Sequence, residues 1–162
     1  MPKRSVRFTA IATAAAAAIG MAMAPAQAGP GHSGAPHGAP VGKPGDPKLV
    51  KRIVTVTMND DMRFVPDRID VRKGETVRFV VRNIGTIKHE MVLGTEKEIK
   101  EHADVMLKFP DMEHEDENAV TVHPGLVGEL VWQFTSAGPV TFACLVPGHY
   151  DAGMVGQLRV RP

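Results

Sequence analysis

Apolar residues recur at every second position over much of this chain, in short runs that are separated by turn residues. In the first run, Val54, Val56 and Met58 lie on one face. A period of two places apolar side chains on one face of a strand, and that face must pack against another sheet. Many short strands with Gly and Pro turns between them predict an antiparallel β-sandwich, which is an all-β fold.

The later runs fit the same pattern, with one exception. Further strands are expected at residues 76–81, 89–93, 119–122, 126–134, 140–143 and 155–160. The exception is the segment 95–108, where apolar residues recur at helical spacing and Thr95 with Glu98 offers a capping box. We therefore predict an all-β fold with one short helical insertion.

The N-terminus has the composition of a secretory signal peptide. Lys3, Arg4 and Arg7 precede an apolar, alanine-rich stretch, and Ala-Gln-Ala at residues 26–28 offers a small-residue cleavage site. The apolar stretch is shorter than the roughly 20 residues of a membrane-spanning helix, which disfavours an uncleaved anchor. We therefore predict a signal peptide over residues 1–28, export to the periplasm, and a mature chain that does not span the membrane.

The next segment, residues 29–47, is rich in Gly, Pro and Ala and has almost no large apolar side chain. Such a segment cannot bury enough surface to fold, so we expect a flexible leader there and a single domain over residues 48–162. His32 and His37 in this leader are candidates for transient metal binding, with chance occurrence as the equal alternative.

The charge balance bears on the class of partner. Removal of the signal peptide takes away three basic residues and leaves 16 Lys and Arg against 18 Asp and Glu, a formal net charge of −2. This balance implies no nucleic-acid partner. Acidic residues cluster between positions 111 and 117, where they either steer a cationic partner or form an ordinary solvated loop.

Cys144 is the single cysteine of the chain. In an oxidising compartment an unpaired thiol is prone to oxidation unless it forms a disulfide or binds a metal. Metal binding is the simpler explanation for a single cysteine. His149 and Met154 follow at steps of five residues, with the turn-forming Pro147 and Gly148 between the first two. Thiolate, imidazole and thioether form a soft donor set that suits copper, whereas a thioether is not a usual zinc ligand.

A blue-copper type of site needs one further histidine. Of the remaining histidines in the domain, His102 falls in the expected helix, His114 in the acidic loop and His123 beside a proline. His89 is the best candidate, although the fold would have to bring it to the metal from far along the chain. The competing interpretation is that these cysteine, histidine and methionine side chains are ordinary core and surface residues.

Over about residues 50–161 the chain resembles the cupredoxins, the blue-copper family of plastocyanin, azurin and rusticyanin. The matching segments are the turn and strand at residues 71–77, the loop at 83–89, the strand Phe142-Ala143-Cys144, Pro147-Gly148-His149 and Met154. The resemblance implies a Greek-key β-sandwich that holds one type 1 copper ion. The ligands it implies are His89, Cys144 and His149 in the equatorial positions and Met154 as the weak axial ligand.

One residue departs from the family pattern. Azurins and plastocyanins place Asn directly after the first histidine, where it ties the two ligand loops together, and this chain has Glu90. A change beside a ligand can alter ligand orientation and redox potential. His89-Glu90-Met91 and residues 112–115 also resemble a subgroup of exported cupredoxins associated with bacterial copper tolerance.

Two functions remain open from the sequence. One is a periplasmic electron carrier that cycles copper between two oxidation states and meets redox partner proteins. The other is a copper-tolerance protein that binds or oxidises Cu(I), or that sequesters or chaperones it without a dedicated redox partner. A copper enzyme is disfavoured, because such catalysis needs further copper sites with further histidines. We expect a monomeric, non-enzymatic protein with redox or copper-handling partners.

A second, softer copper(I) site is a further possibility. Its candidate ligands are Met91, Met106, Met112 and His114, because thioethers select Cu(I). The alternative is that Met91 and Met106 fill the core and Met112 is a loop residue.

Overall fold

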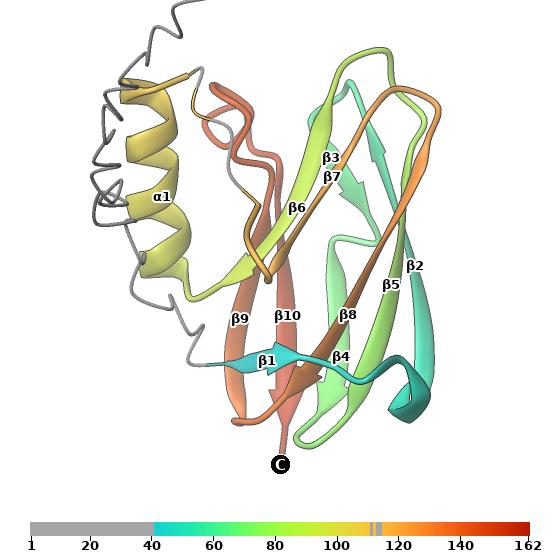
Figure 1. Cartoon of the computed structure of the whole chain (residues 1–162). Coiled ribbons are helices and arrows are strands. Elements are labelled where there is room, and N and C mark those ends of the chain that lie inside the picture. Colours follow the sequence, from blue (N-terminus) through green and yellow to red (C-terminus); the bar gives the residue numbers. More distant parts are fainter. Residues whose placement is uncertain (1–40, 111, 113–114) are drawn as a thin grey trace, which may run out of the picture. The chain divides into compact units, whose positions relative to one another are not determined.

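Two β-sheets pack face to face in the computed structural model, with one helix at the side (Figure 1). The structure describes residues 41–110, 112 and 115–162, so the expected signal peptide and most of the expected leader lie outside it. One sheet has the strand order β1-β8-β5-β2-β3, and the other has the order β4-β10-β9-β6-β7. The all-β sandwich with one helix that the sequence predicted is confirmed.

The strands are β1 (Gly42–Pro44), β2 (Arg52–Asn59), β3 (Arg63–Val65), β4 (Arg68–Arg72), β5 (Thr76–Asn83), β6 (His89–Gly94), β7 (Ala119–Val122), β8 (Val127–Phe134), β9 (Gly138–Ala143) and β10 (Val155–Arg161). The helices are the 3-10 turn η1 (Pro47–Leu49) and α1 (Glu96–Lys108). The short strands β1, β3 and β4 were not predicted. Within the described residues, neither helix has the length and apolar character needed to cross a membrane.

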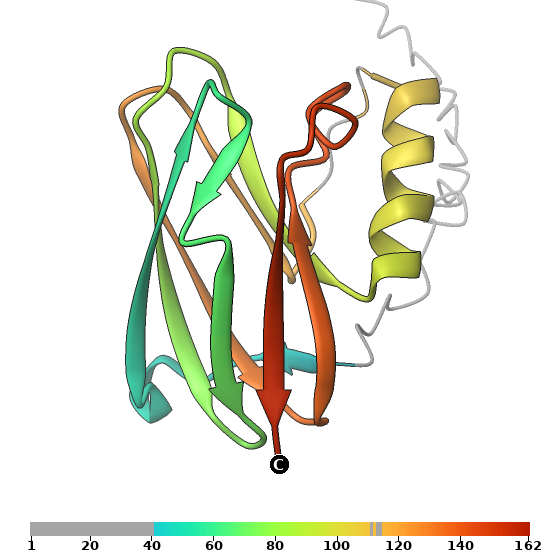
Figure 2. The same cartoon turned by 180° about the vertical axis from the view of Figure 1, so that it is seen from behind.

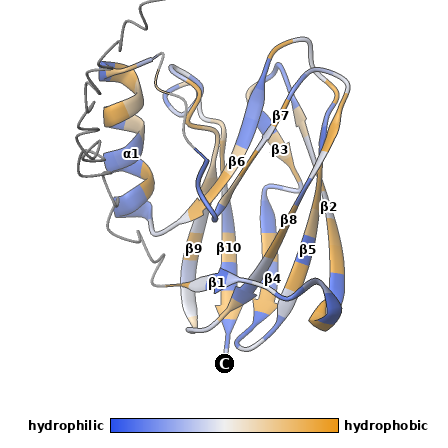
Figure 3. Ribbon diagram, in the orientation of Figure 1, coloured by the Kyte–Doolittle hydropathy of each residue, from blue (hydrophilic) through white to orange (hydrophobic). Residues whose placement is uncertain are grey.

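Alternation along the strands builds the core, as the bands of hydropathy in Figure 3 illustrate. In β5, Val77, Phe79 and Val81 are fully buried, while Arg78 and Val80 between them are partly exposed. Phe64 of β3 and Phe142 of β9 meet edge to face across the two sheets, with ring centroids 5.1 Å apart. Each such buried side chain contributes about 1.5–3 kcal/mol, so the sandwich rests on these inward-facing rows.

Two strand pairs are parallel, although the pattern of short strands and turns predicted an antiparallel sandwich. β2 pairs with β5 and β4 pairs with β10 in parallel registers, so both sheets are mixed. A strand has the same period of two in either kind of pair. Periodicity therefore locates strands without showing the direction in which they pair.

The folded domain begins before residue 48, inside the segment expected to be a flexible leader. β1 pairs in antiparallel register with β8, and Val41 is buried in the core. A Cβ atom at Gly42 would overlap the Trp132 ring, so only glycine lets the backbone lie this close to the ring. This strand depends on backbone pairing and on the close approach of Gly42 to the Trp132 ring. Neither feature produces apolar alternation in the sequence.

The helix α1 begins where the sequence predicted. Thr95 Oγ1 accepts a hydrogen bond from the Glu98 N–H (3.3 Å), and a Glu98 carboxylate oxygen accepts one from the Thr95 N–H (2.8 Å). This reciprocal capping box satisfies two backbone donors that would otherwise lack partners at the start of the helix.

On its buried face, α1 packs against strands β6 and β9, on one side of the sandwich (Figure 2). Ile99, Ala103 and Met106 of the helix share a core cluster with Ala143 and Leu145, which flank Cys144. The helical insertion therefore supports the segment that carries the single cysteine.

We expect a chain that starts at Lys48 to be less stable than one that starts at Val41, by about 2–3 kcal/mol. The shorter chain loses the β1 pairing and the burial of one valine side chain, which alone contributes about that amount. Urea denaturation of the two truncated proteins measures the difference. Equal midpoints would show that β1 does not stabilise the domain.

Candidate metal centre

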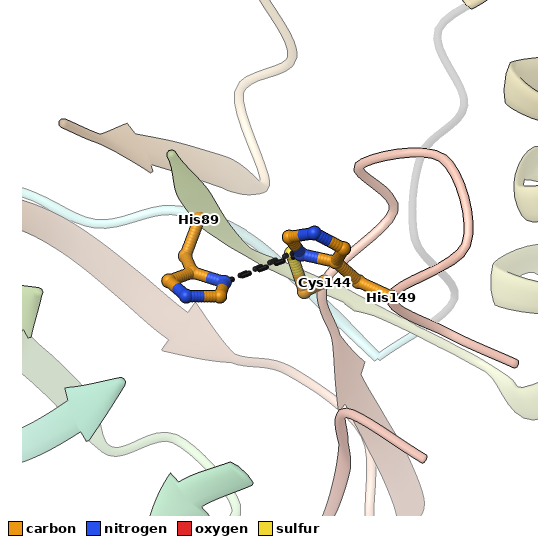
Figure 4. Close-up of side chains that lie close together, drawn as sticks. All are labelled: His89, Cys144 and His149. Atoms are coloured by element: carbon orange, nitrogen blue, oxygen red, sulfur yellow. Dashed lines mark hydrogen bonds between the residues drawn. The ribbon is translucent and has the colours of Figure 1, made fainter. Parts of the chain in front are cut away.

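Three buried donor atoms face one another near the loop that joins β9 to β10 (Figure 4). His89 is the first residue of β6, Cys144 follows β9 directly, and His149 lies in the β9–β10 loop. Cys144 Sγ is 3.2 Å from His149 Nδ1 and 4.0 Å from His89 Nδ1, and the two Nδ1 atoms are 3.2 Å apart. Within residues 41–110, 112 and 115–162, no other group of three or more His, Cys, Asp or Glu side chains is arranged to hold a metal ion.

The separations of these atoms fit a single shared ion. Nitrogen and sulfur ligands lie about 2.0–2.3 Å from a first-row metal such as zinc. Two donors on the same ion are therefore about 3–4 Å apart, which matches the 3.2–4.0 Å between these atoms. One thiolate and two imidazoles match the equatorial donors of a blue-copper site. The structure thus brings together three residues that are separated by up to 60 positions in the chain.

Backbone hydrogen bonds shape the loop that carries the remaining donors. Met154 N donates to His149 O (3.0 Å), and Cys144 N donates to Met154 O (3.1 Å). Gly148 and Gly153 adopt positive φ angles of 85° and 89°, which glycine tolerates without strain. Met154 itself is fully buried and belongs to the same core cluster as Cys144. All four residues singled out from the sequence therefore lie on adjoining segments.

Comparison with known proteins agrees with this geometry. Residues 50–161 match the family model of copper binding proteins, plastocyanin/azurin family. The chain belongs to this family. Together with the donor set, membership assigns one copper ion as the cofactor of this cupredoxin.

Two curated relatives share much of the sequence. The chain is 55% identical over 136 residues to the "Copper-resistant cuproprotein CopI" of Rubrivivax gelatinosus, which covers 82% of each chain. It is 39% identical over 155 residues to the protein of the same name from Pseudomonas aeruginosa, with 78% of this chain and 85% of that protein covered.

Among solved structures, auracyanin B superposes with a TM-score of 0.61 at 21% identity, over 77% of this chain and 99% of that one. This similarity shows that the two proteins share a fold.

Burial shifts the pKa values of Cys144 and His149 in the metal-free cupredoxin. Burial raises the pKa of the Cys144 thiol to about 12. Hydrogen bonds from the Glu90 and Val146 backbone N–H groups oppose this increase, and the charge of the Glu90 carboxylate adds a smaller one. Burial also lowers the pKa of His149, with a further contribution from the neighbouring His89 ring, so that the imidazole stays neutral. Metal ligation needs a thiolate, so a metal held by Cys144 would have to displace the proton of this thiol.

Glu90 contacts the segment that carries Cys144. Its backbone N–H donates to Cys144 Sγ at 3.4 Å, and its Oε1 accepts a hydrogen bond from Leu145 N at 2.9 Å. Glu90 thus connects the start of β6 with the segment after β9. An Asn ties the corresponding loops together in azurins and plastocyanins, whereas this chain uses a carboxylate.

Asp60 is a neighbour of the centre that the sequence did not reveal. Its Oδ1 lies 3.1 Å from His89 Nε2, and its Oδ2 accepts hydrogen bonds from Thr86 N and Thr86 Oγ1, both at 2.7 Å. The bonds from Thr86, followed by that from His89, lower the pKa of Asp60 to about 2, so it is a carboxylate at neutral pH. Asp60 precedes His89 by 29 residues, and an acidic residue in a turn carries no sequence signal of such a contact.

The methionines considered for a second copper site fall into different surroundings. Met91 is fully buried in the main core, Met106 lies on the buried face of α1, and Met112 is exposed. Met106 and Met112 line one surface hollow together with Glu90 and His123, and Met91 is not among its lining residues. Three other candidates, His32, His37 and His114, lie outside the described residues.

We expect the metal-free protein to lose stability as the pH rises above about 9. Because the pKa of Cys144 is about 12 in the folded chain and 9.0 for an ordinary thiol, the folded state holds one more proton between these values. The loss should reach up to about 1.4 kcal/mol per pH unit. Cys144→Ser has no thiol to ionise and should lack this component. Urea denaturation across this pH range measures both proteins, and parallel profiles would contradict the prediction.

A second prediction concerns the hydrogen bond between Glu90 and the backbone after Cys144. In Glu90→Ala the buried Leu145 N–H loses its acceptor, which should destabilise the metal-free protein by about 1–3 kcal/mol. Glu90→Gln keeps an oxygen acceptor and should retain most of the stability. Thermal denaturation of both variants tests this prediction, and equal losses would show that the hydrogen bond does not matter.

Proposed function

We propose that this cupredoxin holds a mononuclear type 1 copper ion and serves periplasmic copper resistance, with one-electron transfer as its chemistry. In this assignment His89, Cys144 and His149 are the equatorial ligands and Met154 is the weak axial ligand. The observation that carries the proposal is the convergence of Nδ1, Nδ1 and Sγ within 3.2–4.0 Å of one another. Copper supplies a one-electron couple when it is bound by such a set.

The burial of the donors supports electron transfer over catalysis. His89 and Cys144 have no exposed surface, and His149 is only 9% exposed. A substrate molecule has little access to such a centre. Electron transfer needs no such access, because an electron can pass through the exposed edge of the His149 ring. We therefore propose a non-enzymatic protein.

The rigidity of the site is the second support. His89 is the first residue of β6, Cys144 directly follows β9, and Met154 directly precedes β10. Each therefore lies at the end of a strand in the sheet β4-β10-β9-β6-β7. Ligands held by packed strands move little when the charge of the bound ion changes. Small rearrangement is what fast one-electron transfer requires.

The biological role is inferred from relatives and from the N-terminus. Two relatives at 55% and 39% identity carry the name "Copper-resistant cuproprotein CopI". The first residues of this chain have the composition of a secretory signal peptide, which supports a periplasmic location. We propose that the protein acts there as a monomer and passes electrons to redox partner or copper-handling proteins.

A second candidate is sequestration or chaperoning of Cu(I) without a dedicated redox partner. The observation in its favour is that Met106, Met112 and His123 line one hollow beside the centre. Thioethers and imidazole are ligands that Cu(I) accepts. Copper stoichiometry separates the two candidates: we expect one ion per chain for the electron carrier, and two ions would favour sequestration.

Visible and EPR spectroscopy of the copper-loaded protein tests the ligand assignment. We expect an intense thiolate-to-copper band in the native protein, its loss in Cys144→Ser, and strong weakening of copper binding in His89→Ala. His123→Ala is the matched control, since this exposed histidine lies outside the donor cluster, and it should keep the band. A native protein without the band would contradict the assignment.

Growth in copper tests the proposed role. Deletion of the gene should make the cells sensitive to copper, and the native chain should restore growth where Cys144→Ser does not. Unchanged growth of the deletion strain in copper would refute a role in resistance.

A further inference from the structure

The Asp60 carboxylate meets His89 on the side of the imidazole ring that faces away from the other donors. His89 Nε2 is 3.1 Å from Asp60 Oδ1, whereas His89 Nδ1 is 3.2 Å from His149 Nδ1 and 4.0 Å from Cys144 Sγ. The ring therefore has the carboxylate at one nitrogen and the metal centre at the other.

This arrangement determines the tautomer of His89. A carboxylate can only accept a hydrogen bond, so Nε2 of the ring must carry the proton. In the neutral ring, Nδ1 then has a free lone pair, which points at Cys144 and His149. This tautomer is the one that a metal ligand at Nδ1 requires.

The loop before His89 holds Asp60 in place. Thr86 donates two hydrogen bonds to Asp60 Oδ2, from its backbone N–H and its hydroxyl group. A Cβ atom at Gly85 would overlap Asp60 Oδ1, so a glycine is needed for the loop to approach the carboxylate this closely. Asn83 steadies the same loop, since its Oδ1 accepts from Gly85 N and its Nδ2 donates to Ile87 O. The loop is thus fitted around the carboxylate.

We propose that Asp60 is a positioning residue of the metal centre, which fixes the orientation and tautomer of His89 and places a negative charge behind it. A carboxylate on the far nitrogen of a ligating histidine raises the basicity of that ligand. The charge also favours Cu(II) over Cu(I), because the higher oxidation state gains more from it. This inference rests on the proposed role of His89 as a ligand.

The first test needs no copper. Nitrogen NMR of the metal-free protein should show His89 protonated at Nε2, with a slowly exchanging proton. In Asp60→Ala the ring should populate both tautomers and the proton should exchange rapidly. Asp61→Ala is the matched control, because it removes an equal charge at the next residue of the chain. The Asp61 carboxylate accepts a hydrogen bond from Asn59 Nδ2 (3.2 Å). The control should leave the His89 signals unchanged.

The second test measures copper affinity and reduction potential. We expect Asp60→Ala to bind Cu(II) about 10–100-fold more weakly, with a smaller loss for Cu(I) and a higher reduction potential. Asp60→Asn, which keeps the shape and removes the charge, should also raise the potential. Gly85→Ala, which displaces the carboxylate without removing it, should change Cu(II) affinity in the same direction. Asp61→Ala should leave both quantities unchanged.

Parallel measurements on His89→Ala separate this inference from the proposed function. If His89→Ala abolishes the thiolate-to-copper band while Asp60→Ala leaves the NMR signals, affinity and potential as in the native protein, the positioning role is wrong and the ligand assignment stands. If His89→Ala leaves the copper site intact, His89 is not a ligand, and both are overturned.

Discussion

The metal centre depends on the antiparallel register between β6 and β9. Val92 pairs with Ala143 in this register, so the start of β6 lies beside the end of β9. His89 and Cys144 therefore meet although 55 residues separate them. A slip of one residue would turn Cys144 to the opposite face of the sheet, because side chains alternate with a period of two. The centre thus exists only in one pairing of these two strands.

Several other contacts hold that register in place. The core cluster beneath α1 packs against Ala143 and Leu145, and Glu90 bonds to the backbone just after Cys144. The bonds from Met154 to His149 and from Cys144 to Met154 close the loop onto the end of the strand pair. The donors are consequently placed by the folded protein before any metal arrives, which is the condition for a small rearrangement on electron transfer.

Two carboxylates next to the centre give it a particular electrostatic character. The Glu90 carboxylate lies on the Cys144 side, and the Asp60 carboxylate lies behind His89. Both negative charges favour the more highly charged state of a bound cation. If copper is held as proposed, these two carboxylates should stabilise Cu(II) relative to Cu(I).

The sequence revealed those features that depend on local pattern. The alternation in β5 and β8 predicted strands, and the Thr95 capping box predicted α1. The spacing after Cys144 indicated the loop that brings His149 close to the thiol. His89 was reached by elimination among the histidines. Local pattern did not show the parallel pairs, which have the same period as antiparallel ones, or β1, which relies on backbone pairing and on Gly42. Asp60 was equally hidden, because its contact with His89 exists only once two loops have folded together.

X-ray absorption spectroscopy at the copper edge tests the preorganised centre most directly. Spectra of the Cu(II) and Cu(I) forms report the number and kind of ligands in each oxidation state. A centre built by the fold predicts one sulfur at short distance and two imidazole nitrogens in both forms, with little change in their distances. The absence of a short copper–sulfur distance, or the loss of an imidazole on reduction, would contradict it.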